Sequence, residues 1–193
     1  MYKLCKTEKS ASRQQMLESG LLAAMISKPY EEISVSDLCD RLSIPRKAFY
    51  RYFSGKEGAL LSLIDHTLMT FHTFHPASAP TTGRTPHAEL TRFFLFWQSH
   101  RQLLDALIHS NLTGLLVQRA VAISATGEVL PLRMLPQEDP RLMHHTMNFA
   151  VCGMMYLVLD WHLNNYLCPA EQMADTALRL VSQPLFSNLP EFL

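Results

Sequence analysis

The chain has 193 residues, of which 48% are hydrophobic and 18% are charged, and its 17 basic residues balance its 17 acidic ones. This length allows one or two domains with a sizeable core, and the zero net charge excludes a protein that coats long polyanions. Long helical patterns dominate and alternating strand patterns are scarce, so the sequence predicts an all-α fold of about nine helices.

Nothing in the sequence directs the chain to a membrane or out of the cell. No apolar run reaches the length of a membrane span, and the first ten residues lack the apolar core of a signal peptide. The four cysteines are scattered without the spacing of a metal site or a disulfide framework, which fits reduced thiols. We therefore expect a cytoplasmic protein with no membrane partner.

The first helix is predicted at residues 10–27, where apolar residues recur near the 3.6-residue spacing. It ends at Lys28, since Pro29 disfavours the helical conformation in the residue before it. Residues 1–9 are polar and basic, and two interpretations stay open for them. They form either a solvated tail or an arm whose lysines contact a nucleic-acid backbone.

A concentration of positive charge follows the first helix. Residues 41–56 hold five cations with no acid among them. Just before this run, Ser34 with Asp37 is typical of a capping box, which predicts that a short helix begins near Val35 or Ser36.

A second short helix is predicted directly after the first one. Ser43 occupies the turn, and Pro45 suits the first helical position, where its missing N–H costs nothing. Phe49 is then expected to point inward. The outward positions carry cations and a tyrosine, namely Arg46, Lys47, Tyr50 and Arg51. Such a helix, braced by another before it, fits a helix-turn-helix reader of the DNA major groove.

Residues 33–61, with the preceding helix, resemble the DNA-binding domain of TetR-family transcriptional regulators. The matching segments are MLESGLLAAM, V-x-D-L-C-D-R-L, A-F-Y-R-Y-F and G-K-E-G-A-L-L. The resemblance covers roughly the first third of the chain. It implies a helix-turn-helix domain at 1–55, a connecting helix at 56–74, and a ligand-binding and dimerisation domain at 75–193.

The resemblance also implies that the protein is associated with the nucleoid, and it implies which residues contact DNA. They are Ser34, Ser36, Arg46, Lys47, Ala48, Tyr50, Arg51 and Lys56. Tyr50 and Lys56 match family positions that contact phosphate, and Arg46 or Lys47 reading guanine is a hypothesis. Three departures from the family pattern keep the operator from being borrowed from a relative: Ser43 in place of glycine, Pro45 in place of serine or threonine, and Lys47-Ala48 in place of Gly-Thr.

Six further helices are predicted in chain order, at 56–72, 88–99, 101–109, 111–126, 141–167 and 169–182. A proline-rich linker at 75–86 and a loop at 129–140 separate them. The aromatic and methionine residues of this part have two open interpretations, an apolar ligand pocket or plain core. The candidate pocket residues are Phe93, Phe96, Trp97, Leu104, Leu115, Met147, Met154 and Tyr156.

In TetR-like proteins the last two helices form a four-helix dimer interface with their copies. The resemblance therefore implies a homodimer, whose two helix-turn-helix domains would bind a palindromic double-stranded DNA operator. The candidate interface residues are Ala150, Gly153, Leu157, Trp161, Met173, Ala177 and Leu180.

The sequence predicts neither an enzyme nor a cofactor or metal site. There is no Gly-rich phosphate loop, no G-x-S-x-G and no H-E-x-x-H, and the pair His72 and His75 lacks supporting cysteines or carboxylates. The expected function is a repressor released by a small apolar ligand. The alternative is a ligand-independent regulator whose C-terminal domain serves dimerisation or protein interaction.

Overall fold

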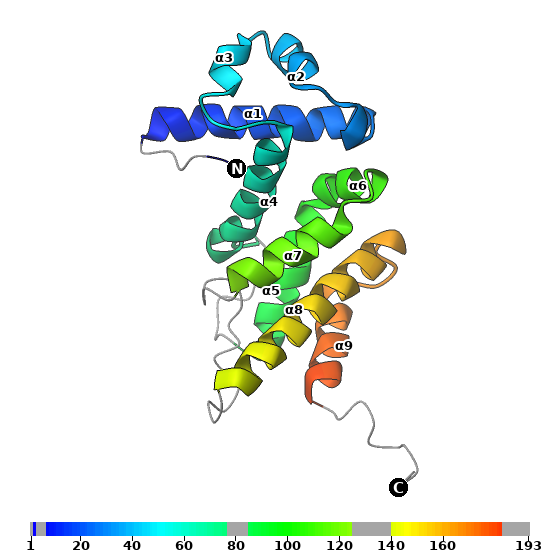
Figure 1. The fold of residues 1–193 in the computed structure, drawn as a ribbon. Coiled ribbons are helices and arrows are strands. Elements are labelled where there is room, and N and C mark those ends of the chain that lie inside the picture. The colour runs from blue at the N-terminus through cyan, green and yellow to red at the C-terminus, as the bar shows by residue number, and fades with distance from the viewer. Residues whose placement is uncertain (1, 3–6, 77–84, 125–139, 183–193) are drawn as a thin grey trace, which may run out of the picture. The chain divides into compact units, whose positions relative to one another are not determined.

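The computed structural model describes residues 2, 7–76, 85–124 and 140–182, and all structural statements concern these residues. Within them the regular structure is helical, which confirms the predicted all-α class (Figure 1). The α-helices are α1 (Glu8–Ser27), α2 (Val35–Arg41), α3 (Arg46–Phe49), α4 (Lys56–Thr70), α5 (Pro86–Ser99), α6 (Arg101–His109), α7 (Thr113–Ser124), α8 (Pro140–Leu163) and α9 (Ala170–Ser182). Two short 3₁₀ helices are η1 (Tyr30–Glu32) and η2 (Phe71–Thr73). The predicted loop at 129–140 lies almost wholly outside the described residues.

The helices group into two compact units. Unit 1 contains α1 to α4 together with α6 and α7, whereas unit 2 contains η2, α5, α8 and α9. The sequence-based division at 1–55, 56–74 and 75–193 stays a prediction, since compactness is not a test of which segments fold on their own.

Helix α1 is the centre of unit 1, because α2, α4 and α6 all pack on it. Thr7 caps its first turn by accepting a hydrogen bond from the Ser10 amide at 3.3 Å. A side chain at Gly20 would meet Leu42, whose Cδ1 lies 2.7 Å from an ideal Cβ position. Glycine therefore lets the end of α2 approach the α1 backbone closely, as seen where α2 lies above α1 in Figure 1.

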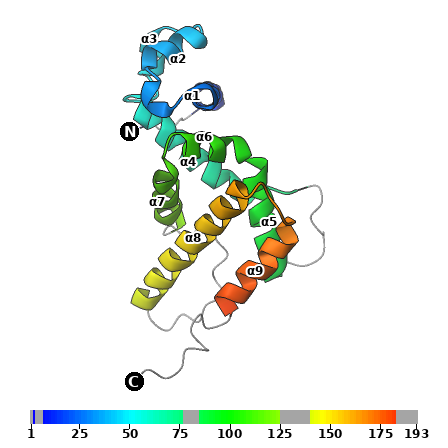
Figure 2. The same ribbon diagram turned by 90° about the vertical axis from the view of Figure 1, so that its right-hand side faces the viewer.

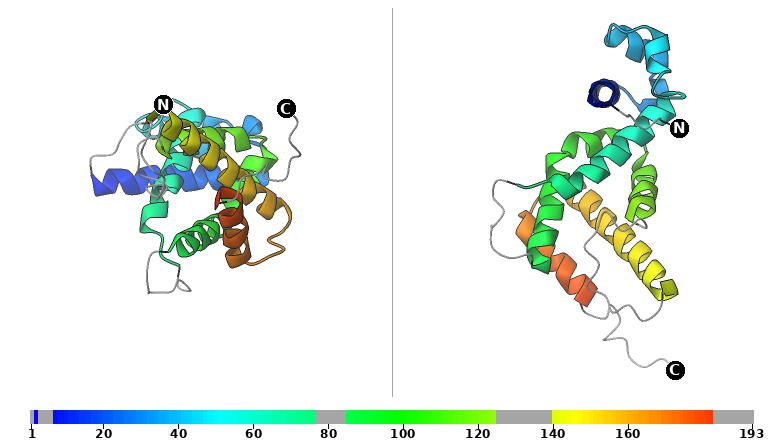
Figure 3. Two further views of the ribbon diagram at one scale, coloured as in Figure 1. Left: turned by 90° about the horizontal axis from the view of Figure 1, so that it is seen from below. Right: turned by 90° about the vertical axis from the view of Figure 1, so that its left-hand side faces the viewer.

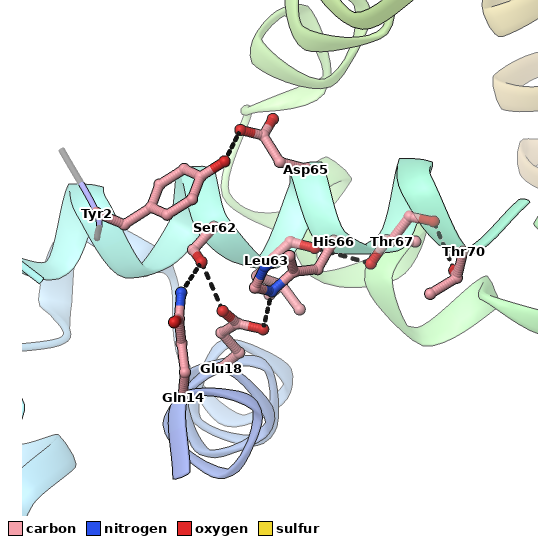
Figure 4. Close-up of polar contacts among 9 residues, drawn as sticks. All are labelled: Tyr2, Gln14, Glu18, Ser62, Leu63, Asp65, His66, Thr67 and Thr70. Carbon is pink, nitrogen blue, oxygen red and sulfur yellow. Dashed lines mark hydrogen bonds and ion pairs between the residues drawn. The ribbon is translucent and has the colours of Figure 1, made fainter. Parts of the chain in front are cut away.

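A chain of buried and half-buried polar groups joins α1 to α4 (Figure 4). Gln14 Nε2 donates to Ser62 Oγ at 2.7 Å, and Ser62 Oγ donates to Glu18 Oε1 at 2.6 Å. The other Glu18 oxygen lies 2.9 Å from Nδ1 of His66, and this contact raises the pKa of the imidazole. We call these four residues the α1–α4 network.

A second polar contact joins α4 to α7 and to the chain's start. Asp65 on α4 is buried, and Arg119 on α7 donates to it from Nε at 2.7 Å and from a terminal nitrogen at 2.6 Å. Tyr2 donates its hydroxyl to the same carboxylate at 2.7 Å, and burial with this contact raises the pKa of Tyr2 to about 12. The Tyr2 backbone also pairs with Phe53, just ahead of α4.

Unit 2 is held together mainly by apolar and aromatic contacts. Helix α5 packs along α9 and also contacts α8 (Figures 2 and 3). Around Phe96 the rings of Phe71, Phe74 and Trp97 all lie with centroids 5.3 Å away in edge-to-face arrangement. Trp161 on α8 meets the edge of Phe94 at 5.6 Å.

Helix α8 bears on the expected absence of a membrane span. Its residues Arg141–Leu163 have the length and a mean hydropathy, 1.2, of a candidate membrane span, although no apolar run of that kind was expected. Only 28% of the residues in the most apolar window are buried in the protein. Length and composition alone also suit a helix whose apolar side is covered by protein, and α8 buries Val151, Met155 and Val158 in unit 2.

Candidate nucleic-acid interface

The predicted capping box is present at the start of α2. The Asp37 amide donates to Ser34 Oγ at 3.1 Å, and the Ser34 amide donates to Asp37 Oδ2 at 3.0 Å. Lys28 lies 3.0 Å from the same carboxylate oxygen. The backbone hydrogen bond and the lysine together lower the pKa of Asp37 to about 2. Ser34 accepts in this cap, so its hydroxyl proton stays available to a phosphate.

The turn between α2 and α3 is a Schellman motif, which explains the family's glycine at this position. The Ile44 amide donates to Cys39 O at 2.9 Å and the Ser43 amide donates to Asp40 O at 3.1 Å. In this motif the residue that directly follows the helix end takes the left-handed conformation, and here that residue is Ser43, with φ of 52°. Glycine would take this conformation without steric cost, whereas serine takes it at the cost of strain from its Cβ atom.

Helix α3 begins one residue later than predicted. Pro45 has φ of −65° and ψ of 141°, so it is the extended residue that precedes the helix, and Arg46 is the first helical residue. The helix is four residues long and ends at Phe49. The Phe49 carbonyl then accepts hydrogen bonds from the amides of Tyr52 and Phe53, which form a tight turn. Phe49 and Phe53 are both about 1% exposed, as predicted for Phe49, and their rings lie 5.3 Å apart.

The outward side of α3 and the following turn forms what we call the recognition surface, made of Arg46, Lys47, Tyr50 and Arg51. All four side chains are exposed, as predicted. Within the described residues, neither Arg46, Lys47 nor Arg51 makes a side-chain hydrogen bond or ion pair, so their charges are uncompensated. Ser34 is also exposed, whereas Ser36 and Ala48 are half-buried. DNA contact by these residues stays a prediction.

Lys56 has a structural role that sequence reasoning missed. Its ammonium donates to Tyr30 O at 2.8 Å and to Glu31 O at 3.0 Å, and lies 4.4 Å from the centre of the Tyr30 ring. Two of its three protons therefore hold η1, and one is left for the predicted phosphate contact. Ser110 fixes the other side of η1, because its hydroxyl accepts from the Tyr30 amide at 3.0 Å.

A cleft near the start of α1 was also missed. It has a volume of about 290 Å³ and is lined by Thr7, Lys9, Ser10, Arg13, Arg51 and Tyr52. We call it the basic cleft. One sequence signal could have indicated it: Lys9 and Arg13 are four residues apart, so they share a face of α1, the helix that supports α3.

The predicted pocket residues are divided between the two units. Five are in unit 2 and buried or half-buried, namely Phe93, Phe96, Trp97, Met147 and Met154. Leu104 and Leu115 belong to unit 1. Tyr156, by contrast, is 63% exposed.

The predicted interface residues divide in a similar way. Trp161, Met173 and Ala177 lie in the core of unit 2 instead of on its surface. Trp161 is committed there, because its indole N–H donates to Cys168 O at 2.9 Å. Gly153 and Leu180 are exposed, and Ala150 and Leu157 are half-buried. Helix α8 also exposes four large residues seven positions apart, namely Leu142, Phe149, Tyr156 and Leu163, which we call the α8 stripe.

Two histidines on α8 have polar partners within the chain. His162 Nδ1 lies 2.6 Å from the Tyr166 hydroxyl, and His144 Nε2 lies 3.1 Å from Asn148. In the described part of the chain, no group of three histidine, cysteine, aspartate or glutamate residues is placed to hold a metal ion.

Known proteins resemble this chain at the level of motif and of fold. Residues 20–63 match the family described as bacterial regulatory proteins, tetR family. The HTH-type transcriptional regulator EthR of Mycolicibacterium smegmatis is 46% identical over 55 residues, which are 28% of this chain and 22% of that protein. The chain thus matches less than a quarter of this relative's length.

Two solved structures share the fold over most of their length. The dihydroxyacetone kinase operon activator DhaS has a TM-score of 0.56 at 14% identity, covering 88% of this chain and 93% of its own. The fatty acid degradation regulator FadR of Bacillus halodurans has a TM-score of 0.54 at 14% identity, covering 94% and 98%. The helix-turn-helix geometry, the motif residues and the family match together show that residues 20–63 are similar to the DNA-binding domain of the tetR family of bacterial regulatory proteins.

Proposed function

We propose that the chain is a homodimeric repressor that binds a palindromic double-stranded DNA operator in the cytoplasm. The observation that carries the DNA-reading part is the recognition surface. Its cations are exposed and have no ion-pair partner among the described residues, while Phe49 and Phe53 anchor the same turn in the core. A side chain that reads a nucleobase needs a free polar end and a backbone that is held in place, and this arrangement supplies both conditions.

The two cations at the start of α3 have the chemistry to read guanine. Arginine and lysine donate to guanine O6 and N7, and each such contact discriminates by about 1–3 kcal/mol against the wrong base. We therefore expect Arg46→Ala or Lys47→Ala to relax the preference at one base pair. Uniform weakening on every sequence would identify the residue as a backbone contact.

The operator is tested by selecting bound duplexes from a random pool at two salt concentrations. Two inverted half-sites centred about 34–36 Å apart, one turn of DNA, are the expected result for a two-fold dimer. Salt-sensitive binding without a preferred sequence would contradict sequence-specific reading, because phosphate contacts alone produce it. A promoter carrying the recovered operator, fused to a reporter, then tests repression, since an activator would raise the signal.

The α8 stripe supports the dimer. Four large apolar side chains at seven-residue spacing form one continuous line on a helix, and a second copy of that helix can cover it. Gly153 lies on the exposed side of α8, and no atom lies within 4 Å of an ideal Cβ there, so a partner helix could approach closely.

Phe149→Glu tests the dimer, because Phe149 is 69% exposed and its replacement leaves the core of unit 2 intact. We expect light scattering to show a dimer for the unmodified chain at micromolar concentration and a monomer for the variant. Gln172→Glu adds the same charge at an exposed position of α9 and serves as the control. A monomeric unmodified chain would contradict the proposal.

Release by a small apolar ligand is supported by one buried polar atom in unit 2. Thr91 Oγ1 on α5 is enclosed and has no hydrogen-bond partner within the described residues. An unpaired buried hydroxyl is costly, and a ligand bearing a carbonyl or hydroxyl group would relieve that cost. The ligand must favour the state with low DNA affinity, typically by about 1–3 kcal/mol.

A second candidate function is favoured by the packing around Phe96. Phe93, Phe96 and Trp97, which were candidates for a pocket wall, contact other rings edge to face and fill one another's space. Unit 2 would then serve only dimerisation or protein interaction, and no ligand would release the DNA.

Thermal unfolding with a panel of aliphatic and aromatic compounds separates the two candidates. Under the ligand proposal, at least one compound raises the melting temperature and lowers operator affinity, and Thr91→Val weakens both effects. A panel without any shift, together with operator binding that no compound changes, would favour the ligand-independent regulator.

A further inference from the structure

The basic cleft is formed by two segments that are far apart in the sequence. Thr7, Lys9, Ser10 and Arg13 come from the first turns of α1. Arg51 and Tyr52 come from the turn that follows α3. Tyr52 is buried, and the neighbouring Phe53 is fixed by its backbone pairing with Tyr2, so the second wall is held in place. Among the described residues that line the cleft there is no carboxylate.

Three positive charges meet in this cleft without a counter-charge. Lys9, Arg13 and Arg51 are all exposed, and within the described residues none of them forms a side-chain ion pair or hydrogen bond. Like charges that share a cleft repel one another, and an anion bound between them converts that repulsion into attraction. The α1 N-terminus adds to this field, because helix dipoles favour negative charge there.

We propose that the basic cleft binds a backbone phosphate of DNA outside the base pairs that α3 reads. This inference rests on the proposed function, because it needs a DNA strand on the recognition surface. Arg51 belongs to both the recognition surface and the basic cleft, so a strand that passes Arg51 leads directly to Lys9 and Arg13. The hydroxyls of Thr7, Ser10 and Tyr52 can donate to phosphate oxygens beside the cations.

The double variant Lys9→Ala/Arg13→Ala tests this assignment and leaves Arg51 in place. We expect it to bind the selected operator about tenfold more weakly or worse, with an unchanged preference at every base pair. The salt dependence of its binding should fall by about 0.9 in log–log slope for the lost phosphate. Arg101→Ala, which removes an exposed cation at the start of α6, is the matched control.

A scan with neutral methylphosphonate groups identifies the contacted phosphate. Single phosphates of the operator are replaced in turn, and affinity is measured for the unmodified chain and for the double variant. We expect one position per half-site, outside the selected bases, at which the unmodified chain loses affinity and the double variant loses none. Equal losses at every position for both proteins would overturn the proposal, since the cations would then act only through their general field.

The outcomes separate failure of the cleft from failure of DNA reading. If the unmodified chain selects no sequence, the proposed function fails first. If it selects an operator that the double variant binds with unchanged affinity and salt slope, only the cleft assignment is overturned.

A free anion is the remaining source of phosphate for the cleft. Inorganic phosphate at constant ionic strength could raise the melting temperature of the unmodified chain, but not of the double variant. Such a shift, with operator binding unaffected by Lys9→Ala/Arg13→Ala, would assign the cleft to a small free anion and overturn the DNA assignment. Circular dichroism of both variants confirms that the exposed substitutions leave the fold intact.

Discussion

The two units of this chain have interiors of different chemistry. Unit 1 buries charged and polar groups where its helices meet, with the α1–α4 network on one side of α4 and the Asp65–Arg119 pair on another. Unit 2 buries rings, and α5 alone contributes Phe93, Phe94, Phe96 and Trp97 to its core.

This difference concerns how tightly each unit specifies helix position. A hydrogen-bonded carboxylate tolerates little movement of its donors, because a buried charge that loses its partners is strongly destabilising. Ring contacts are less directional, so helices can shift slightly while apolar area stays buried. Unit 1, which contains α3, is tied by directional bonds, whereas unit 2 is tied by contacts that depend mainly on volume. The first three of the four predictions below test this contrast.

The largest effect is expected from removing a ring in unit 2. Phe96 is about 1% exposed and contacts four neighbouring rings, those of Phe71, Phe74, Trp97 and His100. Phe96→Ala should lower the free energy of unfolding by about 3–5 kcal/mol, through lost transfer energy and the cavity left behind. Urea unfolding followed by circular dichroism measures this loss.

Phe96→Leu is the matched control for a core that depends on volume. Because it keeps most of the apolar volume, it should cost much less, about 1–1.5 kcal/mol. A leucine variant as unstable as the alanine variant would show that ring geometry, and not volume, holds unit 2 together.

In unit 1, removing one partner of the charge pair between α4 and α7 should cost more stability than replacing both partners with apolar residues. Arg119→Ala leaves the buried Asp65 carboxylate with Tyr2 as its one described donor. We expect a loss of about 2–3 kcal/mol, below the range for fully buried pairs, because water reaches a third of Arg119. Urea unfolding of the Asp65→Leu/Arg119→Met double variant should recover most of this loss. A double variant that is no more stable than Arg119→Ala would contradict a charge-based origin.

The α1–α4 network should make the stability of unit 1 depend on pH. The hydrogen bond to Glu18 raises the pKa of His66 above its usual 6.5, and the charge of Asp65 acts in the same direction. A folded-state pKa above the unfolded value means that the added stability is complete below pH 6.5 and is lost as pH rises through the folded pKa. His66→Gln should therefore flatten the fall in melting temperature above that pH. The exposed His109→Gln serves as the control and should leave the fall unchanged.

Local signals in the sequence predicted α2 and α3 well. The capping box of Ser34 and Asp37 depends on residues three apart, and the inward direction of Phe49 depends on helical spacing, so both were visible before the structure. The start of α3 was misplaced by one residue, because proline's fixed φ suits both the residue that precedes a helix and its first turn.

Features that depend on distant residues were not predictable. Lys56 was expected only to contact phosphate, and nothing local indicates that Tyr30 and Glu31 accept from it. The α1–α4 network pairs side chains 44 or more positions apart. In unit 2, an apolar residue at helical spacing can face its own core or a partner, which is why Trp161 was expected at a dimer interface.

The smallest effect concerns the turn that positions α3. Ser43 holds φ of 52° at the end of α2, where a residue with a Cβ atom is strained. Ser43→Gly should raise the free energy of unfolding by about 0.5–1 kcal/mol, measured by urea unfolding. The control is Asn111→Gly at the end of α6, where φ is 55° and the Leu112 amide closes the same kind of motif on Leu107 O. Asparagine tolerates the left-handed region better than serine does, so this second change should stabilise less. Equal gains at both sites would mean that backbone strain at Ser43 is no greater than at Asn111.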